Sequence, residues 1–326
     1  LIAVLKALVQ KYAGFNAAEN YWLFVEGGAV THIIYTGVRY FSVYSDAANF
    51  GAGMGLAMVV FSISALYYRN PWMKVYLLAV AAAACYGMLI SGTRSALAVP
   101  FAGYAVFVVL SRNFRMVVAG VLLIIAAFIF LNFTTIGQGN PIIRRARSAF
   151  NTQDASFQVR LENQAQLREL MRGKPFGAGL GHGGGKAKVF APDAPLSQVP
   201  TDSWFVMIWV ETGIVGLLLH IGILLYVLGR GAWLVIFRLR NAQLRGLVAA
   251  LVAGISGVVV MSYGNEVLGQ IPTGAIIYMS MAFIFLSPHF DKELEEAEKA
   301  QNTVPRKNLL AVNPRAAALP PAMAKE

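Results

Sequence analysis

Residues 48–67 read ANFGAGMGLAMVVFSISALY, a run without a charged side chain. At 1.5 Å per residue such a run spans about 30 Å, the thickness of the hydrocarbon core of a bilayer. Similar apolar runs recur at residues 73–90, 95–110, 116–131, 203–229, 246–261 and 271–286. Backbone groups in lipid must be satisfied within their own segment, so each run is predicted to be a helix. The predicted fold class is therefore all-α, a polytopic helical membrane protein with about seven transmembrane helices.

The bulk composition agrees with a membrane protein. Hydrophobic residues make up 57% of the chain and charged residues 13%, and the mean hydropathy is +0.58. A soluble domain of this size carries about 25% charged residues. The sole cysteine, Cys85, lies in an apolar run, so no disulfide can form within the chain.

The distribution of apolar runs predicts four regions. We expect membrane helices over 1–132, a long hydrophilic loop over 133–202 and further membrane helices over 203–288. Residues 289–326 balance acids with bases and are rich in Ala and Pro, so we expect a disordered tail. The chain begins at Leu1 without a signal-peptide pattern, and we expect it to be N-terminally truncated.

The short connections between the runs predict the orientation. Three of them carry basic residues and no acid, namely residues 68–74, 111–115 and 230–245. The alternate connections carry one charged residue each, Arg94 and Glu266. Since short basic loops stay in the cytoplasm, residues 16–47 and 133–202 are predicted to face the periplasm and the tail the cytoplasm.

The long loop has a basic excess, with nine Lys or Arg against five acids. Two explanations stay open on charge alone. The excess could reflect chance and attraction to anionic headgroups, or it could serve a phosphate-bearing substrate.

Polar residues gather at the outer ends of the predicted helices rather than in mid-membrane, where Glu211 and His220 are the exceptions. They are Arg39, Asp46 and Asn49, the turn at 91–94, and residues 201–203. This placement favours a site at the outer membrane interface. In the short turn, Arg94 is either a snorkelling interfacial arginine or a fork-shaped donor for phosphate.

One helix is predicted inside the loop. Residues 156–171 lack a helix breaker, and Arg160, Gln164, Arg168 and Arg172 recur every four residues along them. Such a basic stripe is either a solvated face or a binding face. It is followed by a Gly-rich turn over 175–185, which is by itself a weak signal for close approach of a substrate.

The sequence offers little for metal or covalent chemistry. Its four histidines are far apart, at positions 32, 182, 220 and 289, and there is no G-x-S-x-G motif. We expect neither a metal nor another cofactor.

Three segments, in this order, resemble the O-antigen ligase and O-antigen polymerase superfamily of bacterial membrane glycosyltransferases. They are Ser-Gly-Thr-Arg-Ser-Ala-Leu at 91–97, the loop from Arg160 through Pro-Phe-Gly-Ala-Gly-Leu-Gly at 175–181, and the helix entry at 202–217 with Glu-Thr-Gly-Ile-Val-Gly. The resemblance extends over residues 40–290, roughly, and its order and spacing agree with the predicted topology.

The resemblance implies an inverting, metal-independent transfer of a glycan from undecaprenyl pyrophosphate to an acceptor hydroxyl at the periplasmic face of the inner membrane. By this resemblance, Arg94 and Arg160 bind the pyrophosphate, and the basic stripe adds Arg168. Glu211 falls on the family's helix Glu and is expected to be structural, as is Arg39. The implied partners are the lipid-linked glycan, a glycan or lipid A-core acceptor and membrane lipid, but no nucleic acid.

One departure concerns the base. Ligases of this family usually carry a His-Asn pair where this chain has Asp202 and Ser203. Asp202 is therefore a candidate base or an ordinary helix N-cap, and His182 in the Gly-rich turn is an alternative base. The change favours a polymerase, or a relative that acts on exopolysaccharide, over a ligase. The competing hypothesis is a transporter or flippase for a lipid-linked or anionic substrate.

Overall fold

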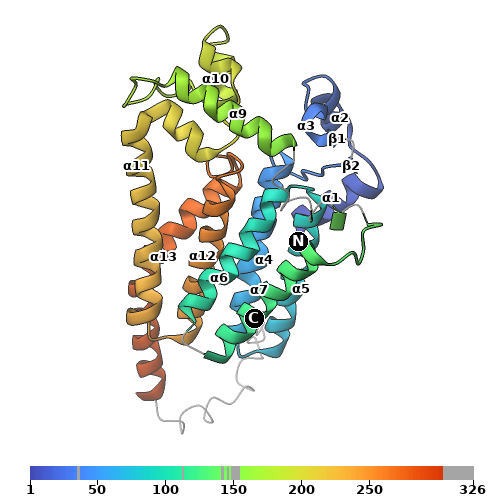
Figure 1. Cartoon of the computed structure of the whole chain (residues 1–326). Coiled ribbons are helices and arrows are strands. Elements are labelled where there is room, and N and C mark those ends of the chain that lie inside the picture. Colours follow the sequence, from blue (N-terminus) through green and yellow to red (C-terminus); the bar gives the residue numbers. More distant parts are fainter. Residues whose placement is uncertain (35–36, 112–113, 141–142, 145–146, 148–154, 304–326) are drawn as a thin grey trace, which may run out of the picture.

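The computed structural model describes residues 1–34, 37–111, 114–140, 143–144, 147 and 155–303. Helices dominate, and the only sheet in these residues is a two-stranded hairpin (Figure 1). Before the first long helix come α1 (Ile2–Tyr12), α2 (Ala17–Phe24), α3 (Ala29–His32), β1 (Ile33–Ile34) and β2 (Gly37–Val38). The bundle continues with α4 (Ala47–Tyr67), α5 (Pro71–Ile90), the 3₁₀ turn η1 (Arg94–Leu97), α6 (Ala98–Leu110) and α7 (Phe114–Phe133).

The second half follows the long loop. The loop contains α9 (Ala155–Leu170), α10 (Gly184–Phe190) and the 3₁₀ turn η2 (Pro195–Gln198). The last elements are α11 (Trp204–Trp233), the π-helical turn η3 (Leu234–Arg238), α12 (Ala242–Met261) and α13 (Thr273–Thr303). The predicted loop helix over 156–171 is thus confirmed as α9.

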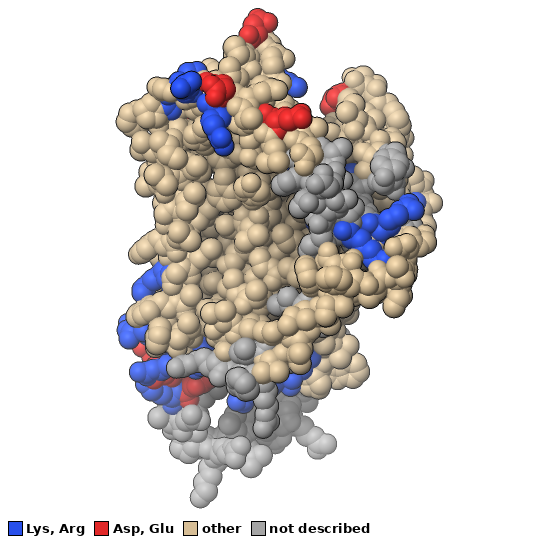
Figure 2. Space-filling model, viewed as in Figure 1, with Lys and Arg blue, Asp and Glu red and all other residues tan. Residues whose placement is uncertain are grey.

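Five helices of the described chain are long and apolar enough to cross a membrane: α4, α5, α11 with η3, α12 and α13. Two shorter apolar helices occupy the other predicted spans, at Arg94–Leu110 and Gly120–Phe133. On the face shown in Figure 2, most charged side chains gather near the two ends, and a broad uncharged belt lies between them. The prediction of an all-α polytopic membrane protein is confirmed.

Helices α4 and α12 form the centre of the bundle, because they are the most buried of the candidate spans. Their contact with α6 depends on small residues. A Cβ on Gly257 would stand 2.3 Å from the backbone oxygen of Val99, so only glycine lets α12 approach the start of α6 this closely. Side-chain caps mark the helix starts, since Asp46 accepts from Ala48 N and Asn49 N at α4 and Asn241 caps α12.

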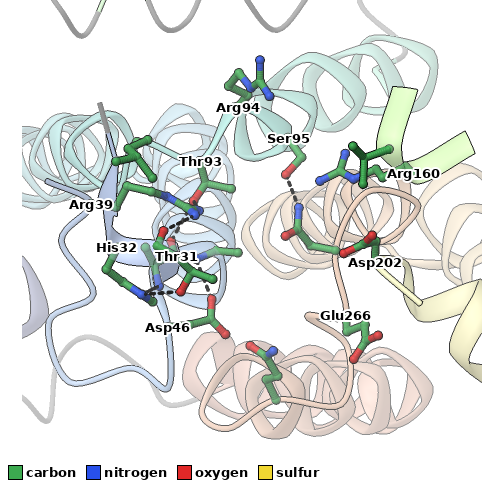
Figure 3. A pocket seen from close by; sticks show the side chains of 17 residues that line it. Thr31, His32, Arg39, Asp46, Thr93, Arg94, Ser95, Arg160, Asp202 and Glu266 are labelled. Atoms are coloured by element: carbon green, nitrogen blue, oxygen red, sulfur yellow. Dashed lines mark hydrogen bonds between the residues drawn. The ribbon is translucent and has the colours of Figure 1, made fainter. Parts of the chain in front are cut away.

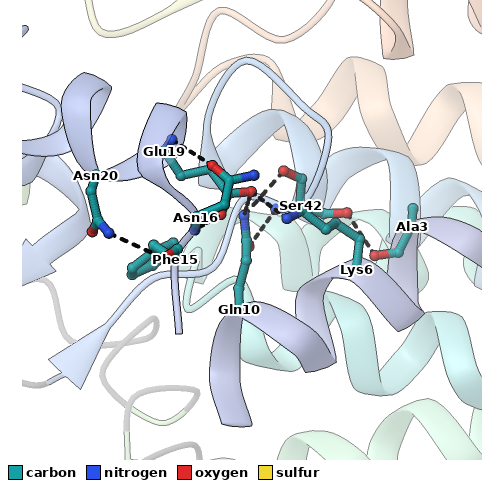
Figure 4. Close-up of polar contacts among 8 residues, drawn as sticks. All are labelled: Ala3, Lys6, Gln10, Phe15, Asn16, Glu19, Asn20 and Ser42. Atoms are coloured by element: carbon teal, nitrogen blue, oxygen red, sulfur yellow. Dashed lines mark hydrogen bonds and ion pairs between the residues drawn. The ribbon is translucent and has the colours of Figure 1, made fainter. Parts of the chain in front are cut away.

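The segment between α1 and α4 is held against α1 by polar contacts (Figure 4). The Gln10 amide donates to Ser42 O at 3.2 Å and accepts from Ser42 N at 2.8 Å. Gln10 also donates to Glu19, which forms an ion pair with Lys6 at 2.7 Å. These contacts fix the backbone a few residues from Arg39.

Both hydrophilic segments predicted to lie outside the membrane are at the same end of the bundle, where α2, α3, α9 and α10 cluster (Figure 1). The connections after α4 and after α11 lie at the opposite end. This agrees with the predicted alternation. Arg112 and Arg145, which contributed to the charge argument, lie outside the described residues.

The predicted disordered tail over 289–326 is wrong for its first part, because α13 continues to Thr303. Asp291 explains the continuation, since its carboxylate accepts from Arg240 N and Asn241 N at the start of α12. Ion pairs between side chains also stabilise this part of α13, and one of them joins Glu295 to Lys299 at 3.2 Å. Residues 304–326 lie outside the described part.

The predicted span over 203–229 is confirmed as part of α11, which bends at Gly213 (Figure 1). Gly213 has φ 69° and ψ −170°, which no helix contains. Trp204 Nε1 donates to His220 Nε2 at 3.0 Å, although the residues are 16 apart in sequence. In a straight helix they would be about 24 Å apart, so the bend folds the first turns of α11 back over the rest.

Candidate functional site

A cavity of about 750 Å³ opens at the end of the bundle that carries α9 (Figure 3). Its walls come from separate segments of the chain: α3 and the residues after it, the start of α4, the α5–η1 turn, α9, the residue Asp202 before α11, and the α12–α13 connection. The charged lining residues are Arg39, Arg94, Arg160, Asp46, Asp202 and Glu266. Segments far apart in the sequence therefore meet at one polar site.

Arg39 is half-buried and oriented by two hydrogen bonds. Its Nη2 donates to Thr93 Oγ1 at 2.8 Å, and its Nη1 donates to Thr31 O at 3.0 Å. Burial lowers the pKa of the Arg39 guanidinium, Asp46 raises it, and the nearby charges of Arg94 and Arg160 lower it. Arg39 was predicted to be a structural residue near the site, and its side chain lines the cavity.

Arg94 follows a compact turn at the end of α5. Ser91 is fully buried, donates to Met88 O at 2.7 Å and accepts from Thr93 N at 3.2 Å. Gly92 has φ 59°, the left-handed conformation that closes the turn. The turn thus sets the direction in which Arg94 enters the cavity.

Arg160 lines the same cavity from α9, so the predicted meeting of Arg94 and Arg160 at one cavity is confirmed. Arg168 does not join them, since it is exposed and is not among the lining residues. The helix explains the difference: eight residues advance the axis by about 12 Å. Farther along, Arg172 pairs with exposed Glu169 at 3.7 Å. The stripe on α9 is a solvated face beyond Arg160.

Asp202 faces the cavity and is not the N-cap of α11. The cap position is Ser203, and the Asp202 carboxylate instead accepts from Asn163 Nδ2 of α9 at 2.9 Å. Asp202 also has φ 53°, which is uncommon for a residue with a side chain. The structure therefore weighs against the N-cap interpretation.

The structure adds two polar residues that the sequence reasoning missed, Asn265 and Glu266 of the α12–α13 connection. Asn265 Nδ2 donates to Ser95 Oγ, and Thr201 Oγ1 donates to the Glu266 carboxylate. Glu266 had been noticed only as the acid of a short outer connection. Its position in that connection was the one feature of the sequence that could have marked it as a site residue.

A second cavity of about 290 Å³ adjoins the first beneath α10 and η2. Five residues line both cavities: Arg160, Asp202, Asn265, Glu266 and Gln270. The smaller cavity adds Gly184, Lys188 and Thr201, among others. The two polar cavities therefore adjoin at these five shared residues, which we call the partition.

The Gly-rich turn docks onto the bend of α11. Ala178 N donates to Val210 O at 2.8 Å, and Gly179 N donates to Glu211 O at 3.0 Å, which satisfies carbonyls that the bend releases. Gly181 N donates to Glu211 Oε1 at 2.9 Å. Buried Glu211 thus holds the loop on the bundle, in line with its expected structural role.

His182 lies in the same turn but does not line either cavity. Among the described residues its Nδ1 is buried without a hydrogen-bond partner. The structure brings together Asp202 and the arginines but leaves His182 apart from them. No cluster of three or more His, Cys, Asp or Glu suited to a metal occurs in the described residues.

Comparisons with known proteins agree with this architecture. The profile of the family described as O-antigen ligase matches residues 77–221, which include the segments at 91–97, 160–181 and 202–217. A protein named O-antigen polymerase from Salmonella muenchen is 29% identical over 196 residues, or 56% of this chain. The match covers 45% of that relative, less than half its length. No solved structure matches.

The family profile and the relative confirm the resemblance first noted in the three sequence segments. The apolar helices and the similarity to this family indicate a multi-pass protein of the inner membrane. Over residues 77–221 the chain is therefore similar to the family described as O-antigen ligase, and over 196 residues it is similar to an O-antigen polymerase.

Proposed function

We propose that the chain carries the active site of a membrane glycosyltransferase that moves a glycan from undecaprenyl pyrophosphate onto an acceptor hydroxyl. The observation that carries the proposal is the meeting of Arg39, Arg94 and Arg160 around one cavity of about 750 Å³. Three separate segments supply these arginines, so the fold itself assembles the cationic site.

A pyrophosphate suits this set of side chains. Guanidinium groups present paired donors that fit phosphate oxygens bidentately. In the transfer, negative charge grows on the leaving pyrophosphate as its bond to the sugar breaks. Fixed cations at that position stabilise the transition state more than the ground state. Arg94 and Arg160 were expected in this role, and Arg39 joins them.

The acceptor's proton requires a base, and the cavity supplies carboxylates. Of the two candidates from the sequence, Asp202 lines the cavity and His182 does not. The geometry therefore favours a carboxylate base over the histidine. Transfer onto a second glycan would make the protein a polymerase, and transfer onto lipid A core would make it a ligase.

The membrane orientation follows from the charge of the short connections. The basic connections lie at the end opposite the cavity, and such connections stay in the cytoplasm. The cavity and the loop over 133–202 then face the periplasm, and α13 ends in the cytoplasm. A cavity at one end of the bundle, rather than at its midplane, favours transfer chemistry over a transporter or flippase.

The proposal is tested with the full-length protein in proteoliposomes, supplied with lipid-linked oligosaccharide extracted from the host. We expect the wild type to lengthen or transfer the glycan, and Arg94→Lys to lose at least about tenfold in turnover because lysine lacks the bidentate fork. Arg172→Lys, at an exposed position two residues past the end of α9, is the matched control and should retain turnover.

Two results would contradict the proposal. If the wild type moved the lipid-linked glycan across the bilayer without forming a new glycosidic bond, the protein would be a transporter. If Arg94→Lys transferred glycan at the wild-type rate, Arg94 would be an interfacial snorkelling residue.

A further inference from the structure

Glu266 occupies the partition between the two cavities. It lies on the connection from α12 to α13 and lines both the larger and the smaller space. A group in this position can contact a molecule in either cavity. Of the acids in the larger cavity, Asp46 does not border the smaller one and is engaged in capping α4.

The Glu266 carboxylate is held by residues of the long loop. Thr201 Oγ1 donates to its Oε1. Gly184 lies against the same carboxylate, and a Cβ there would stand 3.0 Å from both Oε1 and Oε2. Gly184 also has φ 63°, so glycine serves both the backbone conformation and the close approach. The loop thus fixes the carboxylate in place.

The position of Glu266 relative to Arg94 suits an inverting displacement. In such a reaction the acceptor attacks from the face opposite the leaving group, so the base lies across the sugar from the phosphates. Figure 3 shows Glu266 on the opposite side of the cavity from Arg94. Asp202 is drawn beside Arg160 instead, nearer to the expected leaving group.

The smaller cavity has the size and the polar side chains of a binding site for a sugar. At about 290 Å³ it accommodates a sugar unit, and it presents the polar side chains of Lys188, Thr201 and Gln270. These groups can donate to or accept from sugar hydroxyls. An acceptor sugar bound in the smaller cavity would present its hydroxyl, past the shared residues, to the donor sugar in the larger cavity.

We infer that Glu266 is the catalytic base, which accepts the proton of an acceptor sugar hydroxyl seated in the smaller cavity. The inference rests on the proposed function. The acceptor oxygen forms a bond to C1 of the donor sugar while the bond from C1 to the pyrophosphate oxygen breaks. The electron pair of that bond leaves with undecaprenyl pyrophosphate, and the hydroxyl proton passes to the Glu266 carboxylate. Asp202, which accepts a hydrogen bond from Asn163, is then a positioning residue beside Arg160.

The test compares Glu266→Gln, Glu266→Gly and Asp202→Asn in the full-length protein. Gln keeps an oxygen that can accept from Thr201 but is not a base, so turnover should fall roughly 10²-fold or more. Binding of undecaprenyl pyrophosphate alone should stay within about twofold of wild type, which shows that the variant is folded. Formate should restore turnover to Glu266→Gly, because a small carboxylate can occupy the vacated space.

Controls separate this inference from the proposed function. Glu169→Gln, on the exposed face of α9, removes one acid and should retain full turnover. Wild-type turnover in Glu266→Gln, a Glu266→Gly variant that formate does not restore, or a larger loss in Asp202→Asn would overturn the assignment to Glu266. Absence of transfer by the wild type would instead overturn the proposed function.

Discussion

Arg39 shows how a single residue reports on the ligand of the cavity. Burial lowers the pKa of the Arg39 guanidinium, the Asp46 carboxylate raises it, and the positive charges of Arg94 and Arg160 lower it. Its Nε is buried without a hydrogen-bond partner among the described residues, although its Nη atoms are engaged. A polyanion in the cavity would relieve the repulsion among the three arginines, as a pyrophosphate does in the proposed function.

His32 is a second residue whose environment is specific. It is 2% exposed, its Nδ1 contacts Gly28 O at 3.0 Å, and its Nε2 accepts from Ala47 N at 3.0 Å. A ring nitrogen that accepts a backbone hydrogen bond must be unprotonated. Burial lowers the pKa of His32, so the folded protein favours the neutral imidazole.

We predict that stability depends on this neutrality. The folded pKa of His32 lies below the unfolded value of about 6.5, so its contribution is present above pH 6.5, roughly, and is lost as the pH falls below it. The thermal midpoint of the detergent-solubilised protein should therefore decrease between about pH 6.5 and 5. His32→Gln should show a shallower decrease, and His289→Gln, exposed on α13, should match the wild type. Equal slopes in all three proteins would exclude His32 as the source.

At the scale of the element, the bend of α11 organises the site. It frees the carbonyls of Val210 and Glu211 to accept from the Gly-rich turn. It also brings Trp204 to His220 and so places Asp202 and Thr201 over the bundle. The sequence had offered the Gly-rich turn as a place of close approach to a substrate. In the structure its first glycines approach α11, and only Gly184 reaches the cavities.

We predict that Gly213→Ala disrupts the docked loop. Alanine is strained at φ 69°, and its Cβ would stand 2.0 Å from Pro175 O. The loop over 171–202 should then be cleaved by protease at least about tenfold faster, and transfer should be lost with it. Gly222→Ala on the same helix is the matched control, because a Cβ there meets nothing within 4 Å. Identical cleavage of the two variants would show that the bend does not depend on Gly213.

At the scale of the whole molecule, the sequence predicted the spans and their alternation well, because lipid imposes one simple requirement on length and polarity. It also predicted that Arg94 and Arg160 meet, from the short turn that carries Arg94, the helical spacing in the loop and the family resemblance. The sequence did not predict the features that depend on tertiary contacts. The bend at Gly213, the docking of Asp291 on the start of α12 and the place of Glu266 depend on partners distant in sequence.

The same limit explains the errors at individual site residues. Four-residue spacing put Arg168 on the same stripe as Arg160, but only the end of α9 near the bundle reaches the cavity. Arg39 was expected to be a structural residue near the site, and its side chain lines the cavity. Its position depends on the contacts of Gln10 with Ser42 and on Thr93, which only the folded chain brings together.

The central claim is that Arg39, Arg94 and Arg160 bind one pyrophosphate. The most direct test is the Kd of undecaprenyl pyrophosphate for the full-length protein and for single alanine variants of these residues and of Arg168. Loss of a charge-assisted hydrogen bond costs about 1.5–3 kcal/mol, so each of the three cavity variants should bind roughly 10- to 100-fold more weakly. Arg168→Ala should bind as the wild type does. Equal binding by all four variants, or a loss confined to Arg168→Ala, would contradict the account.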